Sequence, residues 1–111
     1  MNYTTNTKQT MIFTRYFPES LDLMRKAVLE RKKHFQNIGA FSSQMACVGL
    51  DILLQICRKQ STFLELSLND CELLVECLIA YQKKNTADNM IYVSCGMLID
   101  NLIEGIEELK Q

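Results

Sequence analysis

The sequence has no tryptophan, one proline and only four glycines among its 111 residues. This composition leaves little room for flexible linkers or for a fold built from many tight turns. The longest apolar runs, such as CLIAY, are only a few residues long, whereas a membrane-spanning helix needs roughly 20. The start lacks a charged segment followed by an apolar core, so we expect no secretory signal and a cytoplasmic protein.

No sign of charge dominates, because 12 basic and 13 acidic residues give a formal net charge of −1. Histidine is also scarce, and the only one is His34. Glu30 precedes it by one helical turn, a spacing that metal sites can use, but Lys32 and Lys33 would repel a cation there. We therefore expect no metal and no cofactor.

Cysteine is present in an odd number, and no two cysteines have the short separation typical of zinc or redox motifs. In a reducing compartment such residues are expected to be buried thiols that pack as small hydrophobic side chains. The five are Cys47, Cys57, Cys71, Cys77 and Cys95.

Apolar residues recur with the period of an amphipathic helix in four segments. The sequence therefore predicts an all-α fold with a four-helix bundle-like domain. Residues 10–111 are expected to form this single helical domain, behind a flexible N-terminal tail at residues 1–9. No internal repeat is evident. The predicted helices span about 18–39, 42–60, 67–84 and 87–109.

The ends of these helices carry local signals. Pro18 suits a first helical turn, and Gly39 can adopt the left-handed conformation that closes a helix. The second helix is expected to begin at a serine cap, Ser42 or Ser43, and the third at Ser67.

The second predicted helix is apolar over most of its circumference. Its polar residues Gln44, Asp51, Gln55 and Arg58 form one narrow stripe. A helix of this kind is expected at the centre of a bundle, with neighbours on several sides.

Two short segments are ambiguous. TMIFTRYF at 10–17 fits either a strand or an extra helical turn, and STFLELSL at 61–68 fits a short extended link. If both are strands, they can pair as a two-stranded ribbon beside the helices. Otherwise the first is a short extended N-terminal arm.

The segment MIFTRYF followed by PESLDLMRKAV resembles the opening of a ribbon-helix-helix repressor, over residues 10–30 only. The resemblance implies paired strands that read the DNA major groove. In this alternative the protein is a small nucleic-acid-binding transcriptional regulator, and Arg25, Lys32 and Lys33 are candidate phosphate contacts. Cations near the last turn of a helix are also expected without a ligand, because they stabilise its negative end.

Arg31 falls among the apolar residues of the first helix rather than opposite them. Its aliphatic stem could cover the edge of the core while the guanidinium reaches water. The other interpretation is a structural ion pair with Asp51 or with a carboxylate of the fourth helix.

The outer face of the fourth helix is the most informative feature. Met90, Val93 and Met97 follow a helical spacing away from the predicted core, and the stripe continues into Asp100 and Glu104. Either the first helix or the N-terminal segment covers this stripe, or it is an interface for another protein or a second copy of the chain.

Enzymatic motifs are not evident: the sequence has no glycine-rich phosphate loop and no nucleophile with a nearby base. The sequence therefore predicts a non-enzymatic cytosolic protein that acts through protein contacts. An inhibitor, an adaptor or an accessory regulator fits, and proteins of mobile elements often have this size.

Overall fold

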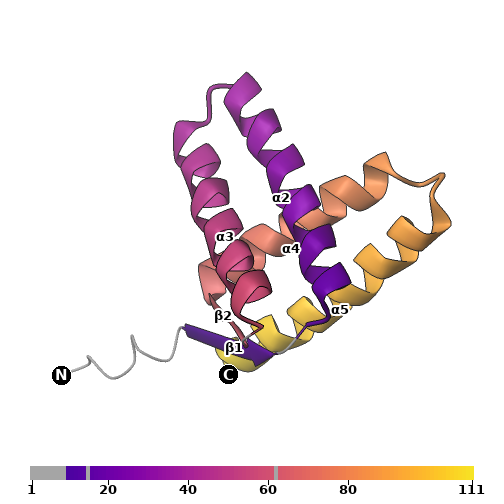
Figure 1. The fold of residues 1–111 in the computed structure, drawn as a ribbon. Helices are drawn as coiled ribbons and strands as arrows, with labels where there is room; N and C mark the ends of the chain where they lie inside the picture. The colour runs from indigo at the N-terminus through magenta and orange to yellow at the C-terminus, as the bar shows by residue number, and fades with distance from the viewer. Residues whose placement is uncertain (1–9, 15, 62) are drawn as a thin grey trace.

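The computed structural model describes residues 10–14, 16–61 and 63–111 (Figure 1). The predicted tail at residues 1–9 lies outside the described residues. Four helices pack against each other, which confirms the predicted all-α, four-helix architecture. The elements are β1 (Thr10–Thr14), α2 (Pro18–Asn37), α3 (Phe41–Gln60), β2 (Leu64–Ser67), α4 (Leu68–Lys84) and α5 (Asn89–Lys110).

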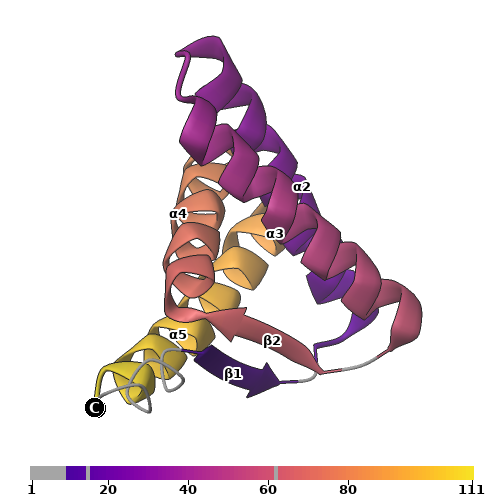
Figure 2. The same cartoon turned by 90° about the vertical axis from the view of Figure 1, so that its left-hand side faces the viewer.

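The two short strands pair in an antiparallel ribbon, so the ribbon interpretation is confirmed. Ile12 lies opposite Leu66, and Thr14 lies opposite Leu64. Leu64 and Leu66 are buried, whereas Glu65 between them is exposed. This alternation packs one face of β2 on the helices. The ribbon lies at the bottom of the molecule in Figure 2, between the end of α3 and the start of α4.

The order strand, helix, helix occurs twice along the chain, once as β1–α2–α3 and once as β2–α4–α5. Helices α2 and α4 contact each other at the centre, and α3 and α5 pack mainly against the helix of their own hairpin (Figure 1). The amino-acid sequences of the two halves show no repeat, but their buried positions have the same spacing. In α2 these are Leu21, Met24, Ala27 and Val28, and in α4 they are Cys71, Leu74, Cys77 and Leu78.

Three of the predicted helix ends are confirmed. Pro18 occupies the first turn of α2, and Gly39 just after that helix has a φ of +74°. The Ser67 hydroxyl oxygen accepts a hydrogen bond of 3.1 Å from the backbone N–H of Asp70 at the start of α4. These signals act within one turn of the chain, which explains why the sequence alone locates them.

The predicted serine cap of α3 is wrong. The helix begins at Phe41, its capping position is Ala40, and no side chain caps it. The backbone N–H of Gln44 donates to the carbonyl of Ala40 at 3.0 Å. The turn at Gly39 therefore passes directly into the helix, and Ser42 and Ser43 lie inside it.

Helix α3 is also not the central helix that its apolar composition predicts. Its polar stripe faces α2, where Arg25 Nε donates to Asp51 Oδ1 at 2.8 Å and Arg58 Nε donates to Asp22 Oδ1 at 3.1 Å. Asp51 is buried, and Gln55 donates to its second oxygen at 2.7 Å. Because α2 supplies ion partners for this stripe, the apolar side of α3 turns outward.

All five cysteines are buried, as the sequence predicts. They belong to one continuous core that includes the inner residues of all four helices and of β2. None of the helices in the described ranges is long and apolar enough to span a bilayer.

Candidate protein interface

The outer side of α5 carries three exposed apolar side chains followed by carboxylates. Met90 is 79% exposed, Val93 is 49% exposed and Met97 is 68% exposed. Asp100 and Glu104 continue the same side of the helix and are also exposed. We call these five residues the α5 outer surface.

The opposite side of α5 fixes this surface in place. The Asp88 carboxylate caps the helix by accepting a hydrogen bond of 3.2 Å from the backbone N–H of Ile91. Cys95 and Leu102 are fully buried on the inner side. Gln82 of α4 donates to the carbonyl of Tyr92 at 2.9 Å. A rigid helix therefore presents the α5 outer surface, and α2 makes only slight contact with α5.

The acidic part of this surface has no cationic partner among the described residues. None of the ion pairs found there involves Asp100, Glu104, Glu107 or Glu108. Carboxylates near the C-terminal end of a helix oppose its dipole. A cation from another molecule would offset both the repulsion between the carboxylates and their conflict with the dipole.

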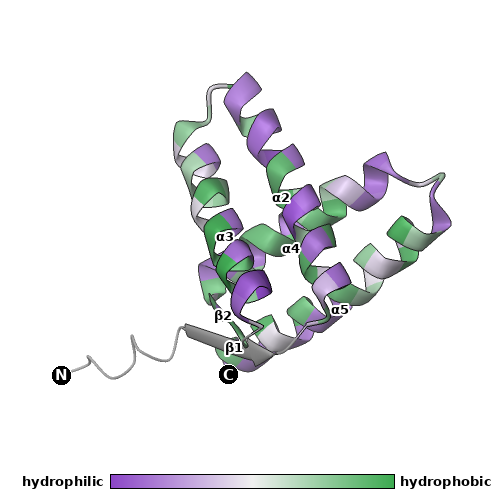
Figure 3. Ribbon diagram, viewed as in Figure 1, coloured by the Kyte–Doolittle hydropathy of each residue, from purple (hydrophilic) through white to green (hydrophobic). Residues whose placement is uncertain are grey.

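A second apolar surface, on α3, was missed by the sequence analysis. Met45, Ile52, Leu53 and Ile56 are all more than one third exposed, and Phe41 is 69% exposed. Apolar segments recur along both outer helices in Figure 3. The signal in the sequence was the regular apolar spacing opposite the polar stripe, but we assigned that spacing to internal packing.

Arg31 forms an ion pair, but not with the predicted partners. Its Nη2 atom lies 3.0 Å from Glu76 Oε2 in α4, and its guanidinium carbon lies 5.0 Å from the centre of the Phe35 ring. Asp51 is bound to Arg25 instead. The crossing of α2 and α4 sets this choice, so Arg31 is a structural link between the hairpins.

The basic residues that the nucleic-acid alternative assigns to phosphate contacts are not all accessible. Arg25 is engaged with Asp51, Lys32 is half-buried and Lys33 is exposed. The ribbon that the ribbon-helix-helix resemblance implies is present, although both strands come from one chain. Its exposed Glu65 carries a negative charge, which DNA phosphates would repel.

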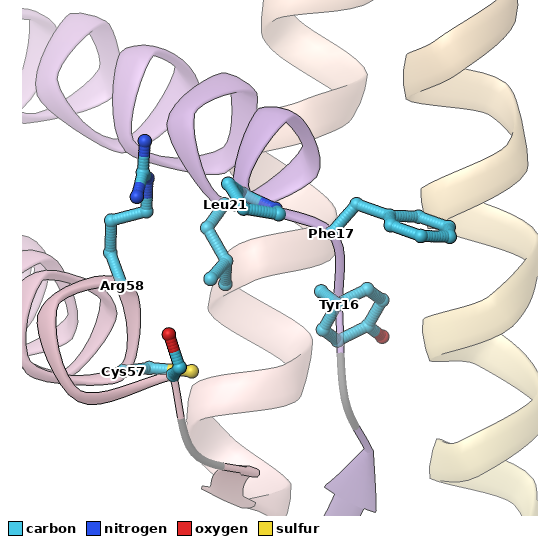
Figure 4. A pocket seen from close by; sticks show the side chains of 7 residues that line it. Tyr16, Phe17, Leu21, Cys57 and Arg58 are labelled. Carbon is cyan, nitrogen blue, oxygen red and sulfur yellow. The ribbon is translucent and has the colours of Figure 1, made fainter.

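A pocket of about 260 Å³ lies where the start of α2 meets the end of α3 (Figure 4). Arg58 reaches toward α2 there, and its guanidinium is held by Asp22. Among the described residues that line it, none is a carboxylate or an imidazole that could act as general acid or base. The lining consists of Tyr16, Phe17, Pro18, Leu21, Cys57, Arg58 and Ser61.

Several cysteines are in surroundings that keep the thiol protonated. Burial raises the pKa of Cys71 to about 11 and also raises the pKa values of Cys47, Cys77 and Cys95. A thiolate nucleophile needs the opposite shift. His34 is exposed, and within the described ranges no three His, Cys, Asp or Glu side chains form a group that could hold a metal ion.

In comparisons with protein-family models, with curated proteins and with solved structures, nothing matches this chain. Its function must therefore be inferred from the chemistry of its surfaces.

Proposed function

We propose that this protein is not an enzyme and acts by binding another protein through the α5 outer surface. The observation that carries the proposal is the exposure of Met90, Val93 and Met97 beside carboxylates that lack ion partners in the described part of the chain. The partner has an apolar groove that accepts the methionines and a basic rim that faces Asp100 and Glu104.

The two parts of the surface contribute differently. Burial of Met90, Val93 and Met97 supplies most of the affinity, and methionine adapts its shape to the groove. Asp100 and Glu104 accelerate association and fix the orientation of the partner. Because α5 is already folded and packed on α4, binding does not require the helix to form, which lowers its entropic cost.

The proposed location is the cytoplasm, because five buried thiols suit a compartment that keeps cysteine reduced. An inhibitor, an adaptor and an accessory regulator all use a fixed binding surface of this kind.

The test is capture of partners from the cytosol of the native host cell with the wild-type chain and with Met97→Lys. A buried lysine in the groove should weaken binding by about tenfold or more. The matched control is Gln36→Lys, which adds the same charge on an exposed part of α2 and should retain the partner. Both variants should keep their free energy of unfolding within about 0.5 kcal/mol of wild type.

The proposal fails if Met97→Lys unfolds the protein, because the stripe would then belong to the core. It also fails if both lysine variants retain every captured protein equally.

The nucleic-acid alternative predicts duplex DNA binding that weakens as salt increases and is lost when Lys32 and Lys33 are both changed to glutamine.

A further inference from the structure

The outer side of α3 carries an uncharged stripe with the repeat of a coiled coil. Two series of positions alternate spacings of four and three residues, namely 42, 46, 49, 53, 56 and 45, 49, 52, 56, and all of these positions are exposed to solvent. The stripe is bordered by Phe41 at one end. We call the following residues the α3 outer stripe: Ser42, Met45, Ala46, Gly49, Ile52, Leu53 and Ile56.

The fold of the monomer does not account for this stripe. Helix α3 lies at one edge of the molecule, with α2 on its inner side (Figures 1 and 2). The ion pairs and buried apolar residues of α3 are on that inner side, including Asp51 and Leu54. A helix that has apolar residues on its outer side as well as on its buried inner side has the pattern expected when something covers its outer side.

Gly49 lies at the middle of the α3 outer stripe, both along the helix and across it. A Cβ atom built at Gly49 would meet no other atom within 4 Å. Glycine lowers the stability of a helix relative to alanine, and here the monomer gains no packing in return. A glycine at such a point allows the backbone of another helix to approach closely.

The size of the side chains changes along the stripe. Ser42 and Ala46 before Gly49 are small, whereas Ile52, Leu53 and Ile56 after it are large. An antiparallel second copy centred on Gly49 would place Ser42 against Ile56 and Ala46 against Ile52, with Met45 against Leu53. Small residues then face large ones in the pairs that involve Ser42 and Ala46, Met45 packs against Leu53, and the two Gly49 residues face each other at the axis. A parallel copy would place small residues against small ones and leave gaps.

Charge is also compatible with self-association. The α3 outer stripe has no charged residue, so two copies do not repel each other along it. The same antiparallel register places exposed Lys59 opposite Gly39 of the other copy, at the end of that copy's α2. The last carbonyl groups of a helix carry a partial negative charge, which a lysine stabilises.

We infer that a second copy of this chain docks on the α3 outer stripe, with the two α3 helices antiparallel about a two-fold axis at Gly49. The contact is isologous, so it closes as a dimer and does not extend into a filament. This surface lies on a different helix from the α5 outer surface. The dimer and the proposed function can therefore each fail without the other.

The first test is the particle mass in solution, measured by sedimentation equilibrium from micromolar to millimolar concentration. Wild type should approach twice the monomer mass. Ile52→Glu should remain at the monomer mass, because it places two carboxylates near the two-fold axis. Met97→Glu adds the same charge on α5 and should dimerise as wild type does. A wild type that stays monomeric, a dimeric Ile52→Glu or a monomeric Met97→Glu would overturn the inference.

Gly49→Gln separates loss of the contact from loss of the fold. Glutamine is a better helix former than glycine, and open space surrounds this position. The thermal midpoint of the monomer should therefore stay at or above the wild-type value. The dimer should dissociate about tenfold more readily or worse, because the side chain separates the two helices. Unchanged dimerisation in this variant contradicts the proposed centre of the contact.

Cysteine cross-linking tests the direction of the pair, since the native cysteines are buried. A mixture of Ser42→Cys and Ile56→Cys chains should form a disulfide-linked dimer on mild oxidation. Ser42→Cys alone should not, because an antiparallel pair separates its two thiols by about 21 Å along the helix. Cross-linking by Ser42→Cys alone, without a disulfide between Ser42→Cys and Ile56→Cys chains in the mixture, would overturn the antiparallel arrangement.

Discussion

Helices α3 and α5 occupy the same place in the two halves of the molecule, but their outer sides differ. The α3 outer stripe is uncharged along its length, whereas the α5 outer surface is apolar around Met97 and acidic from Asp100 onward. An uncharged stripe with graded side-chain size complements a copy of itself. An apolar stripe that ends in carboxylates would place like charges together against a parallel copy of itself, and it complements a basic partner. One topology thus carries two exposed surfaces of different chemistry, for which we propose different partners.

The inner sides of the two hairpins differ as well. Arg25 and Asp51 join α2 to α3 by an ion pair of 2.8 Å. At the matching positions of the second half, by the spacing of buried residues, the chain has Val75 and Ile99, which are apolar. The first hairpin therefore has a directional contact where the second relies on hydrophobic packing. This contact orients α3 with its apolar side outward.

The largest expected change in the free energy of unfolding distinguishes a buried residue of the central helix α4 from an exposed residue of the α3 outer stripe. Leu74 of α4 is fully buried, so Leu74→Ala should lower the free energy of unfolding by about 3 kcal/mol. Ile56 of α3 is 46% exposed, and Ile56→Ala should cost the monomer about 0.5 kcal/mol or less. Urea unfolding at low protein concentration measures both. Equal losses would mean that the α3 outer stripe belongs to the core of the monomer.

A smaller effect tests the difference between the hairpins. Asp51→Ala should cost about 2 kcal/mol, because it leaves Arg25 without its partner at a site where the arginine side chain is only 33% exposed. The double variant Arg25→Val with Asp51→Ile gives the first hairpin the residue types that the second hairpin has at the matching positions. It should unfold within about 1 kcal/mol of wild type, since well-packed apolar residues often replace such a pair without loss.

If the double variant is as unstable as Asp51→Ala, the two hairpins are not equivalent at these positions. If Asp51→Ala costs nothing, the ion pair does not orient α3. Circular dichroism of each variant shows whether the helices remain formed.

The sequence predicts those features of the fold that depend on neighbours within one helical turn. Pro18, Gly39 and Ser67 mark helix ends through local backbone chemistry, and the inner side of α5 follows from its apolar period. The exposure of Met90, Val93 and Met97 then follows geometrically, since the other side of the helix is buried. Whether another protein binds there remains a proposal.

The features that the sequence analysis misplaced depend on which helices meet. A helical wheel shows that Asp51 and Arg58 share a side of α3, but it does not show that α2 supplies partners for them. An apolar helix with a narrow polar stripe therefore fits a central position and an outer position equally well. Arg31 pairs with Glu76 only because α2 crosses α4, which no local pattern specifies.

The smallest expected effect compares glycines in the two outer helices. Gly49→Ala should stabilise the monomer by about 0.5–1 kcal/mol, because alanine is the better helix former and nothing lies within 4 Å of the new methyl group. Gly96→Ala should gain less, because its methyl group would lie 3.2 Å from Gln82 Nε2, which donates to the Tyr92 carbonyl. Thermal unfolding of the two variants at equal, low concentration measures the difference. Equal gains would show that the Gln82 side chain yields without cost. If Gly49→Ala instead lowers the stability, the backbone of α3 is already in close contact with another helix under these conditions. The sign of the stability change would then depend on protein concentration.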